Sequence, residues 1–134
     1  EDFIILYLQP TSPFRNHKHI NKAFDLIKLK RKNALISIIK LNKAIYKSLR
    51  IKKEMVKPIF AESFVTNNRQ ALETLYIPNG AIYIFNSSIF MKNKKLPIRS
   101  SLAYKMSENS SHDIDTLEDY IIAKKMSTKC LIYK

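Results

Sequence analysis

The sequence is poor in several residue types, and each shortage excludes a class of protein. Its 134 residues include a single cysteine, Cys130, so an internal disulfide framework and a cysteine-rich zinc site are excluded. The longest apolar runs, Phe3–Leu8 and Ala34–Ile39, fall well short of the roughly 20 residues that a membrane span needs. No basic leader precedes them, because Glu1 and Asp2 open the chain. We therefore expect a cytoplasmic protein without a membrane partner.

The charge is strongly positive, with 24 basic and 11 acidic residues and a net charge of +13. Nucleic-acid binding is one interpretation. However, the chain has 19 Lys, 19 Ile and 10 Asn against five Arg and one Gly, which is typical of an AT-rich genome. A nucleic-acid surface relies more on Arg and interleaved aromatic side chains. We rank a nucleic-acid-binding module last among the possible functions, although a basic surface would still attract anionic substrates.

Hydrophobic patterning in the first third predicts a strand, a helix and a second strand. The run Phe3–Leu8 does not alternate, so it predicts a strand covered on both faces. Apolar residues at helical spacing predict a helix over 17–32 with Asn16 as its N-cap, and Ala34–Ile39 predicts a second buried strand. Strand, helix and strand at this spacing indicate a βαβ unit, and hence a parallel sheet.

The rest of the chain is expected to complete an α/β domain. Residues 43–75 lack a clear apolar stripe and predict an arm inserted in a single domain that spans 1–134. The only glycine, Gly80, marks a position that excludes a Cβ atom or needs a positive φ. The further predicted elements are a strand over 81–85, a short helix through Met91 capped by Asn86 or Ser87, a strand over 102–106 and a helix over 117–126.

Two segments carry side chains suited to chemistry. Asp113 and Asp115 stand two residues apart, so in an extended segment both carboxylates point to one side and could share a Mg²⁺ ion. Alternatively, Asp115 or Thr116 simply caps the helix that follows. The other segment, 8–15, joins the first strand to the first helix and offers the Gln9 amide, two hydroxyls and the Arg15 cation. That position is where open α/β sheets bind ligands, although a plain turn with a cap is an equal alternative.

Four blocks, in order and with near-family spacing, resemble the N-acylneuraminate cytidylyltransferases and their relatives that act on other nine-carbon sugar acids. They are LQPTSPF at Leu8–Phe14, Arg69-Gln70, PNGAIYI at Pro78–Ile84, and DIDT at Asp113–Thr116 with Asp119. The resemblance implies a mainly parallel, Rossmann-like sheet with helices on both faces. It also implies transfer of CMP from CTP to the sugar acid, release of pyrophosphate, and a homodimer formed through the arm at 43–75.

The resemblance assigns roles only where residues match. Asp113 and Asp115 match the aspartates that hold Mg²⁺, and Gln9 matches a glutamine that faces the sugar. Arg69 matches a catalytic arginine that reaches the neighbouring subunit's site, and Lys47 matches a second such cation after a one-residue gap. Asn79 and Tyr83 match the strand that lines the sugar pocket, although Tyr83 could simply pack in the sheet.

The sequence also departs from the family. Leu96-Pro97 stand where members that use sialic acid often carry aromatics, which favours a different nine-carbon acid. The family's basic, glycine-containing CTP loop has no counterpart here, so we expect a C-terminal portion whose sheet has an uncovered edge. A non-catalytic remnant of the family is therefore the alternative to an enzyme part.

Overall fold

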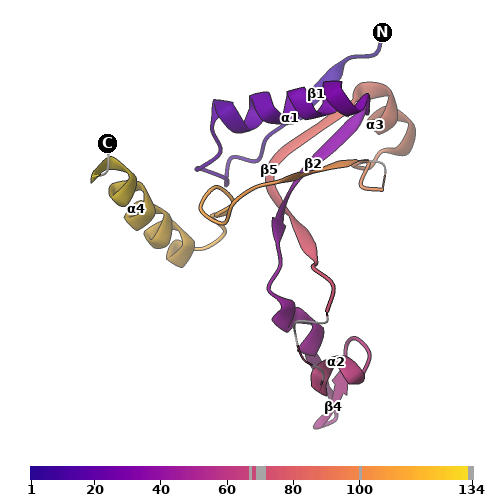
Figure 1. Ribbon diagram of the computed structural model, residues 1–134, viewed down its shortest axis with the longest axis vertical. Coiled ribbons are helices and arrows are strands. Elements are labelled where there is room, and N and C mark those ends of the chain that lie inside the picture. Colours follow the sequence, from indigo (N-terminus) through magenta and orange to yellow (C-terminus); the bar gives the residue numbers. More distant parts are fainter. Residues whose placement is uncertain (67, 69–71, 100, 133–134) are drawn as a thin grey trace. The chain divides into compact units, whose positions relative to one another are not determined.

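The computed structural model describes residues 1–66, 68, 72–99 and 101–132, with side chains through residue 128. It divides the chain into two compact units (Figure 1). The first unit comprises Glu1–Ile39 and Pro78–Lys134, and the second comprises Lys40–Ile77. The bounds of the second unit lie close to the predicted arm at 43–75. Whether that arm joins two subunits stays a prediction.

The first unit is built on a four-stranded sheet with the strand order β1-β5-β2-β6. β1 pairs antiparallel with β5, and β2 pairs parallel with β6. The Asn86 N–H at the end of β5 donates to the Asn33 carbonyl just before β2 at 3.1 Å, and earlier in β5 the Ile82 N–H bonds to Ser37 within β2. β5 therefore runs against β2 as well. The strands are β1 (Ile4–Tyr7), β2 (Ala34–Lys40), β5 (Tyr76–Asn86) and β6 (Leu102–Lys105).

Three of the four strands thus run in one direction, with β5 reversed among them. The predicted α/β class and the shared direction of β1 and β2 are confirmed, but these two strands are not adjacent. A sequence pattern reports that a strand exists and leaves its neighbour open, so the insertion of β5 could not be foreseen.

Helices cover both faces of this sheet, as predicted. α1 (His17–Lys30) packs Ala23 and Ile27 onto one face (Figure 1), and α3 (Ser87–Asn93) packs Phe90 onto the other. Successive residues of a strand point to opposite faces, so neighbouring residues of β2 and β5 enter different cores. The first core includes Leu35, Ile82 and Ile84, and the second includes Ala34, Ile36, Tyr83 and Phe85.

The N-terminus of α1 is capped as predicted. The Asn16 side chain accepts from the His19 N–H, and the His19 ring accepts from the Asn16 N–H, each at 3.2 Å, in a reciprocal capping box. Burial, together with the charge of Lys22, lowers the pKa of His19 and favours the neutral ring that this accepting role requires.

The predicted cap of α3 is wrong. Asn86 is the N-cap residue by position, but its side chain makes no capping hydrogen bond. Instead, the Asp2 carboxylate accepts from the Ser88 N–H at 3.0 Å and from the hydroxyls of Ser87 and Ser88, each at 2.8 Å. A carboxylate also suits the positive end of the helix dipole. The cap comes from the other end of the unit's sequence, where a local pattern could not reveal it.

This cap predicts a pH-dependent stability. Hydrogen bonds from the Ser88 N–H and from the two serine hydroxyls lower the pKa of Asp2 from 3.8 to about 2. The stabilisation is fully present above pH 3.8 and is lost as the pH falls through about 2. We expect Asp2→Asn to lower the urea midpoint at pH 6 and to have a smaller effect near pH 2. An equal shift at both pH values would contradict the assignment.

The expected burial of the first strand is also wrong. On β1, the side chains of Ile4 and Tyr7 are 56% and 44% exposed, and Phe3 just before it is 62% exposed. β1 lies at the edge of the sheet, and nothing in the described part of the chain covers its outer side. The predicted uncovered edge is therefore confirmed, and the apolar run identifies a strand without the partner that would bury it.

The second unit holds η1 (Lys43–Lys47), the hairpin of β3 (Leu49–Lys52) and β4 (Met55–Pro58), and α2 (Ser63–Thr66). Two consecutive positive φ angles, 49° at Lys53 and 63° at Glu54, make the hairpin turn without a glycine. The buried Tyr46 ring packs against Phe60 at 5.3 Å and Phe64 at 5.2 Å between centroids. A small aromatic core therefore holds this unit together.

The last helix, α4 (Leu117–Ile132), is longer than predicted. It has 16 residues, and within the described ranges no helix is long and apolar enough to cross a membrane.

Candidate functional site

The site lies at the end of the sheet where the carboxyl ends of β1, β2 and β6 meet. We call this end the carboxyl edge. The segment after β1 and the segment after β6 are the two that sequence analysis singled out. They meet through the Ile114 N–H, which donates to the Thr11 carbonyl at 3.0 Å. The ends of β2 and β6 are joined by the Met106 N–H, which donates to the Ile38 carbonyl at 2.9 Å. Ligands of open α/β sheets bind at this kind of edge.

The backbone conformation favours a glycine at position 80, which is one of the two predicted reasons. Its φ is +72°, a conformation that residues with a Cβ rarely adopt. A Cβ atom there would lie 1.9 Å from Gln9 Oε1. The Gln9 side chain therefore lies directly against the backbone of β5.

Arg15 fastens this arrangement. Its Nη1 donates to the Gln9 carbonyl at 3.0 Å and to the Ala81 carbonyl at 2.9 Å. The guanidinium that the sequence offered as a ligand for anions thus ties the turn after β1 to β5.

We expect Gly80→Ala to lower the free energy of unfolding by about 1–3 kcal/mol, the usual cost of a strained backbone conformation. The contact with Gln9 adds little, because Gln9 Oε1 ends a flexible side chain that can turn away. The double variant Gln9→Ala, Gly80→Ala should recover at most that small steric part and leave the strain. Urea denaturation of both variants and of Gln9→Ala measures each part. If Gly80→Ala were as stable as the parent, the assigned backbone strain would be wrong.

Asn79 is the centre of a buried hydrogen-bond network. Its Oδ1 accepts from Ser37 Oγ at 2.5 Å and from the Ala81 N–H at 3.3 Å, while its Nδ2 donates to Ser111 Oγ at 2.7 Å. Ser37 Oγ in turn accepts from the Ile82 N–H at 2.7 Å. Asn79 therefore has a structural role, because this network links β2, β5 and the loop before Asp113. Its contact with the sugar stays a prediction.

Sequence analysis missed the two serines of this network. Ser37 is fully buried and Ser111 is 8% exposed. The available signal was Ser37 itself, since a lone hydroxyl within the apolar run of β2 must find a partner once it is buried.

Tyr83 lies on β5 opposite Tyr7, and their ring centroids are 5.5 Å apart. Burial raises the pKa of the Tyr83 hydroxyl, and the charges of Tyr7 and Asp113 raise it further. The tyrosine stays protonated and therefore remains a hydrogen-bond donor close to Asp113. Packing in the sheet accounts for its ring, and its predicted place in a sugar pocket stays a prediction.

Asp119 takes part in capping α4, whereas Asp113 and Asp115 do not. Thr116 caps α4: Thr116 Oγ1 accepts from the Asp119 N–H at 3.2 Å, and Asp119 Oδ2 accepts from the Thr116 N–H at 2.9 Å. Hydrogen bonds from the Thr116 hydroxyl and backbone lower the pKa of Asp119, which keeps it ionised. Because Thr116 and Asp119 complete the cap, the Asp113 and Asp115 side chains are not needed for it.

Asp113 Oδ1 and Ser12 Oγ are buried and have no hydrogen-bond partner among the described residues. Ser12 is 2% exposed and lies beside Gly80, 3.6 Å from the position of a Cβ there. Burying such atoms unpartnered is unfavourable, so each calls for a partner from outside the described residues, such as a water molecule, an ion or a ligand. The described residues contain no cluster of three or more His, Cys, Asp or Glu side chains. The donor set fits Mg²⁺, which needs only one or two protein carboxylates.

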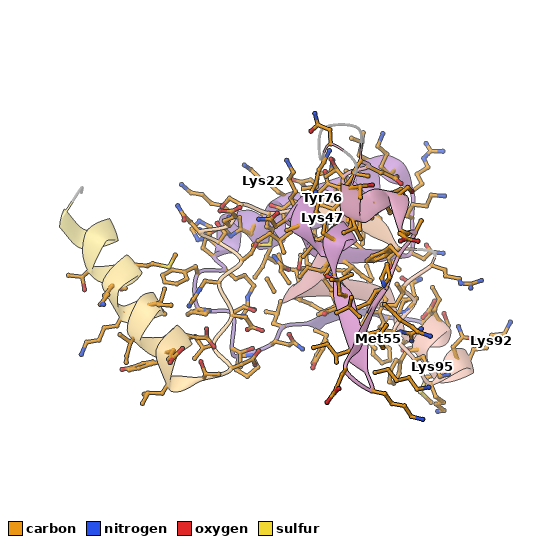
Figure 2. All side chains as sticks on the ribbon, turned by 90° about the horizontal axis from the view of Figure 1, so that it is seen from below. Lys22, Lys47, Met55, Tyr76, Lys92 and Lys95 are labelled. Carbon is orange, nitrogen blue, oxygen red and sulfur yellow. The ribbon has the colours of Figure 1, made fainter. Side chains whose placement is uncertain are left out.

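The structure does not test the site roles predicted for Lys47 and Arg69. Lys47 ends η1 in the second unit and is labelled in Figure 2. Arg69 and Gln70 lie outside the described residues. His112 is half-buried, with its Nε2 at 2.9 Å from the Asp119 carbonyl and its ring 6.2 Å from that of Phe14. Its contacts place it between the turn after β1 and the start of α4.

Comparison with known proteins confirms the predicted resemblance. No protein-family model matches the chain. It is 34% identical over 131 residues to an N-acylneuraminate cytidylyltransferase of Escherichia coli, and 30% identical over 123 residues to one of Streptococcus agalactiae. It is also 32% identical over 127 residues to the CMP-N,N'-diacetyllegionaminic acid synthase of Legionella pneumophila. Each match covers 90% or 91% of this chain.

The chain is much shorter than these relatives. It spans 29% of the length of the two cytidylyltransferases and 53% of the legionaminic acid synthase. Similarity therefore extends over nearly all of this chain and over only part of each relative.

Proposed function

We propose that this chain is the sugar-acid and metal half of a cytidylyltransferase that transfers CMP from CTP to sialic acid or a related nine-carbon sugar acid. The observation that carries the proposal is the meeting of Gln9, Gly80, Tyr83 and Asp113 at the carboxyl edge of the sheet. The names of the relatives support the reaction, because all of them are CMP-sugar-acid synthases or cytidylyltransferases.

In this reaction the anomeric oxygen of the sugar acid attacks the α-phosphorus of CTP. A new oxygen–phosphorus bond forms, the bond from the α-phosphorus to the bridging oxygen breaks, and pyrophosphate leaves. The proton of the anomeric hydroxyl passes to water. The protein needs to form no covalent bond in this reaction. Most of the rate acceleration therefore comes from alignment of the reactants and from stabilisation of charge.

Asp113 and Asp115 would hold Mg²⁺ at this edge. When bound, the ion neutralises charge on the triphosphate and favours ionisation of the attacking hydroxyl. The unpartnered, buried Asp113 Oδ1 supports this assignment, because a cation would compensate the carboxylate where the described protein does not.

Gln9 and Tyr83 would orient the sugar acid. Gln9 offers both an amide donor and an amide acceptor beside Gly80. Tyr83 stays protonated, so its hydroxyl can donate to a sugar oxygen or to a carboxylate. Arg69 and Lys47 would act in the neighbouring subunit's site of a homodimer.

The substrate that we favour is a nine-carbon acid other than sialic acid. Leu96 lines an apolar pocket of about 380 Å³ with Ile5, Tyr7, Phe85 and Phe90, next to the Tyr7–Tyr83 pair. This lining supports an acid with apolar bulk at that position. N,N'-diacetyllegionaminic acid is the natural candidate, because a relative is named for it.

The test is pyrophosphate release by the longer protein that contains this sequence, with CTP, Mg²⁺ and each sugar acid in turn. We expect turnover with at least one acid, and a higher kcat/KM for N,N'-diacetyllegionaminic acid than for N-acetylneuraminic acid. The reverse order would overturn the substrate preference alone. No pyrophosphate with any acid, from folded protein that binds CTP, would favour the non-catalytic remnant.

A further inference from the structure

A second group of charged side chains lies at the other end of the strands, where β2 and β6 begin. Arg31 and Lys32 precede β2, and Lys95 and Arg99 precede β6. We call these four residues the basic edge. Asp113 follows β6 whereas Arg99 precedes it, and a strand of four residues is about 13 Å long. The basic edge is therefore separate from the site proposed for Mg²⁺.

The sheet register places the starts of β2 and β6 side by side. β2 and β6 are hydrogen-bonded parallel neighbours in which Leu35 is opposite Leu102. Lys32 and Arg99 each stand three residues before those partners. Neighbouring strands lie about 4.8 Å apart, so the segments that lead into β2 and β6 enter the sheet side by side.

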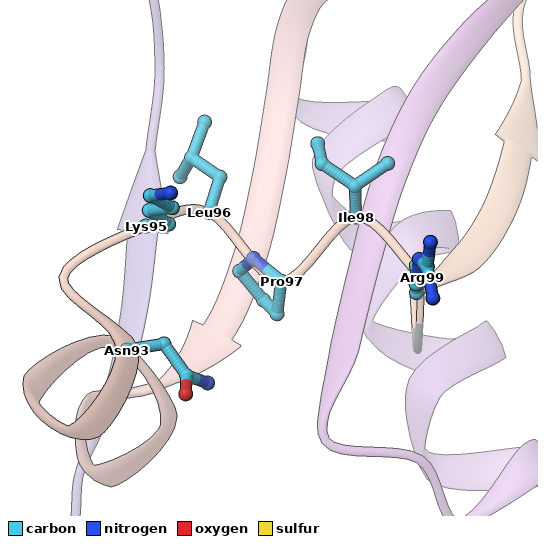
Figure 3. Close-up of a pocket in the computed structure, with 6 residues that line it drawn as sticks. All are labelled: Asn93, Lys95, Leu96, Pro97, Ile98 and Arg99. Carbon is cyan, nitrogen blue, oxygen red and sulfur yellow. The ribbon is translucent and has the colours of Figure 1, made fainter.

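Each half of the basic edge lines a pocket. Lys95 and Arg99, with Asn93, line a pocket of about 420 Å³ whose remaining walls are Leu96, Pro97 and Ile98 (Figure 3). Arg31 and Lys32 line one of about 290 Å³ with Asn33, Ala34 and Ile89. Ile89 and Asn93 both belong to α3, so this helix borders both pockets. Neither lining includes an acidic side chain.

The loop that carries Lys95 and Arg99 is built by its own hydrogen bonds. The Lys94 N–H donates to the Phe90 carbonyl at 2.7 Å, and the Ile98 N–H donates to the Leu96 carbonyl at 2.9 Å. Ser101 Oγ also donates to the Pro97 carbonyl. These bonds fold the loop back before β6, and Lys92 and Lys95 project beside the same short helix in Figure 2.

The charge of this region is uncompensated along the sequence. No Asp or Glu occurs between Asp25 and Glu54, or between Glu73 and Glu108, and these two stretches supply all four cations. The carboxylate at the start of α3, Asp2, is already hydrogen-bonded to Ser87 and Ser88.

We propose that the basic edge binds a compact anion with two or more phosphate groups, such as free pyrophosphate or the phosphates of a nucleotide. Two guanidinium groups offer paired N–H donors to phosphate oxygens, and two ammonium groups add point charges. Pockets of this size suit a small ligand.

The test is calorimetric titration of the full chain, without Mg²⁺, with inorganic pyrophosphate and separately with CTP. The double variant Lys32→Gln, Arg99→Gln removes one cation from each half. The control Lys18→Gln, Arg50→Gln removes the same charge at exposed positions elsewhere. We expect at least tenfold weaker binding in the first variant and less than a twofold change in the control.

The two ligands and one further variant separate the outcomes. Equal loss with pyrophosphate and CTP identifies the phosphates as the shared determinant, and tighter binding of CTP identifies a nucleotide site. Glu54→Gln, which removes an exposed carboxylate outside the basic edge, should bind like the parent. Equal weakening by the control, loss through Glu54→Gln, or absence of binding to either ligand would overturn the proposal.

Discussion

Asp113→Asn is expected to abolish most of the turnover of the longer protein without destabilising it. Asn keeps the size of the side chain and removes the negative charge that a divalent cation needs. Losing electrostatic stabilisation of this kind costs about 10²-fold or more in rate. Steady-state pyrophosphate release at saturating CTP and sugar acid measures the effect.

Stability should move in the opposite direction to activity. Asp113 Oδ1 is buried without a partner among the described residues, so the free protein bears the cost of its desolvation. A neutral amide reduces that cost. We expect the free energy of unfolding of Asp113→Asn, measured in urea without Mg²⁺, to equal or exceed that of the parent. A stabilised, inactive variant would be typical of a residue kept for function.

Two further substitutions complete the design. Asp115→Asn removes the second proposed ligand, an exposed carboxylate, and should lower turnover with little change in stability. Asp25→Asn removes an exposed carboxylate from α1 and should leave both properties unchanged. Full activity in both Asp113→Asn and Asp115→Asn would refute the metal site, whereas loss in Asp25→Asn would show that net charge alone is responsible.

The sequence predicted best what is decided locally. α1 with its Asn16 cap, the strand β2 and the positive φ at Gly80 are each properties of a short segment of the chain. Helical periodicity, a capping side chain and a positive φ are properties of a short segment, so a single sequence can specify them.

The errors arise where a distant partner decides. The cap of α3 comes from Asp2, which is 86 residues from Ser88 along the chain. The exposure of β1 depends on which strand lies beside it, and its apolar pattern carries no such information. In the second unit, Lys53 and Glu54 form a turn with positive φ angles in which neither residue is the glycine or asparagine that would have predicted a hairpin.

The site shows the same division. The two motifs were identified separately, and their meeting through Thr11 and Ile114 is a tertiary contact. Arg15 was interpreted as a possible ligand, and its two carbonyl acceptors give it a structural role that the sequence did not show. Exposed cations are easily interpreted as binding groups, because a sequence does not show which backbone carbonyls they will reach.

Asn79→Ala is expected to destabilise the first unit strongly. It leaves Ser37, Ser111 and the Ala81 N–H without one partner each, all in a buried environment. Each such loss costs about 1–3 kcal/mol, and partial rearrangement of the hydroxyls reduces the sum. We expect the free energy of unfolding to fall by about 2–4 kcal/mol in urea denaturation.

Asn86→Ala is the matched control on the same strand. Its Nδ2 donates to Asp2 Oδ2 at 3.1 Å in an exposed position, so its loss should cost less than about 1 kcal/mol. Equal costs for the two variants would show that the network around Asn79 does not support the fold.

Asn79→Ala also separates the structural role of Asn79 from a role in the site. Ser111, which Asn79 holds, stands two residues before Asp113, so loosening it frees the loop that positions this carboxylate. We expect Asn79→Ala, assayed where it is fully folded, to need more Mg²⁺ for half-maximal rate than Asn86→Ala. A normal Mg²⁺ requirement with a raised KM for the sugar acid would instead assign Asn79 to the sugar pocket, as the family resemblance implies.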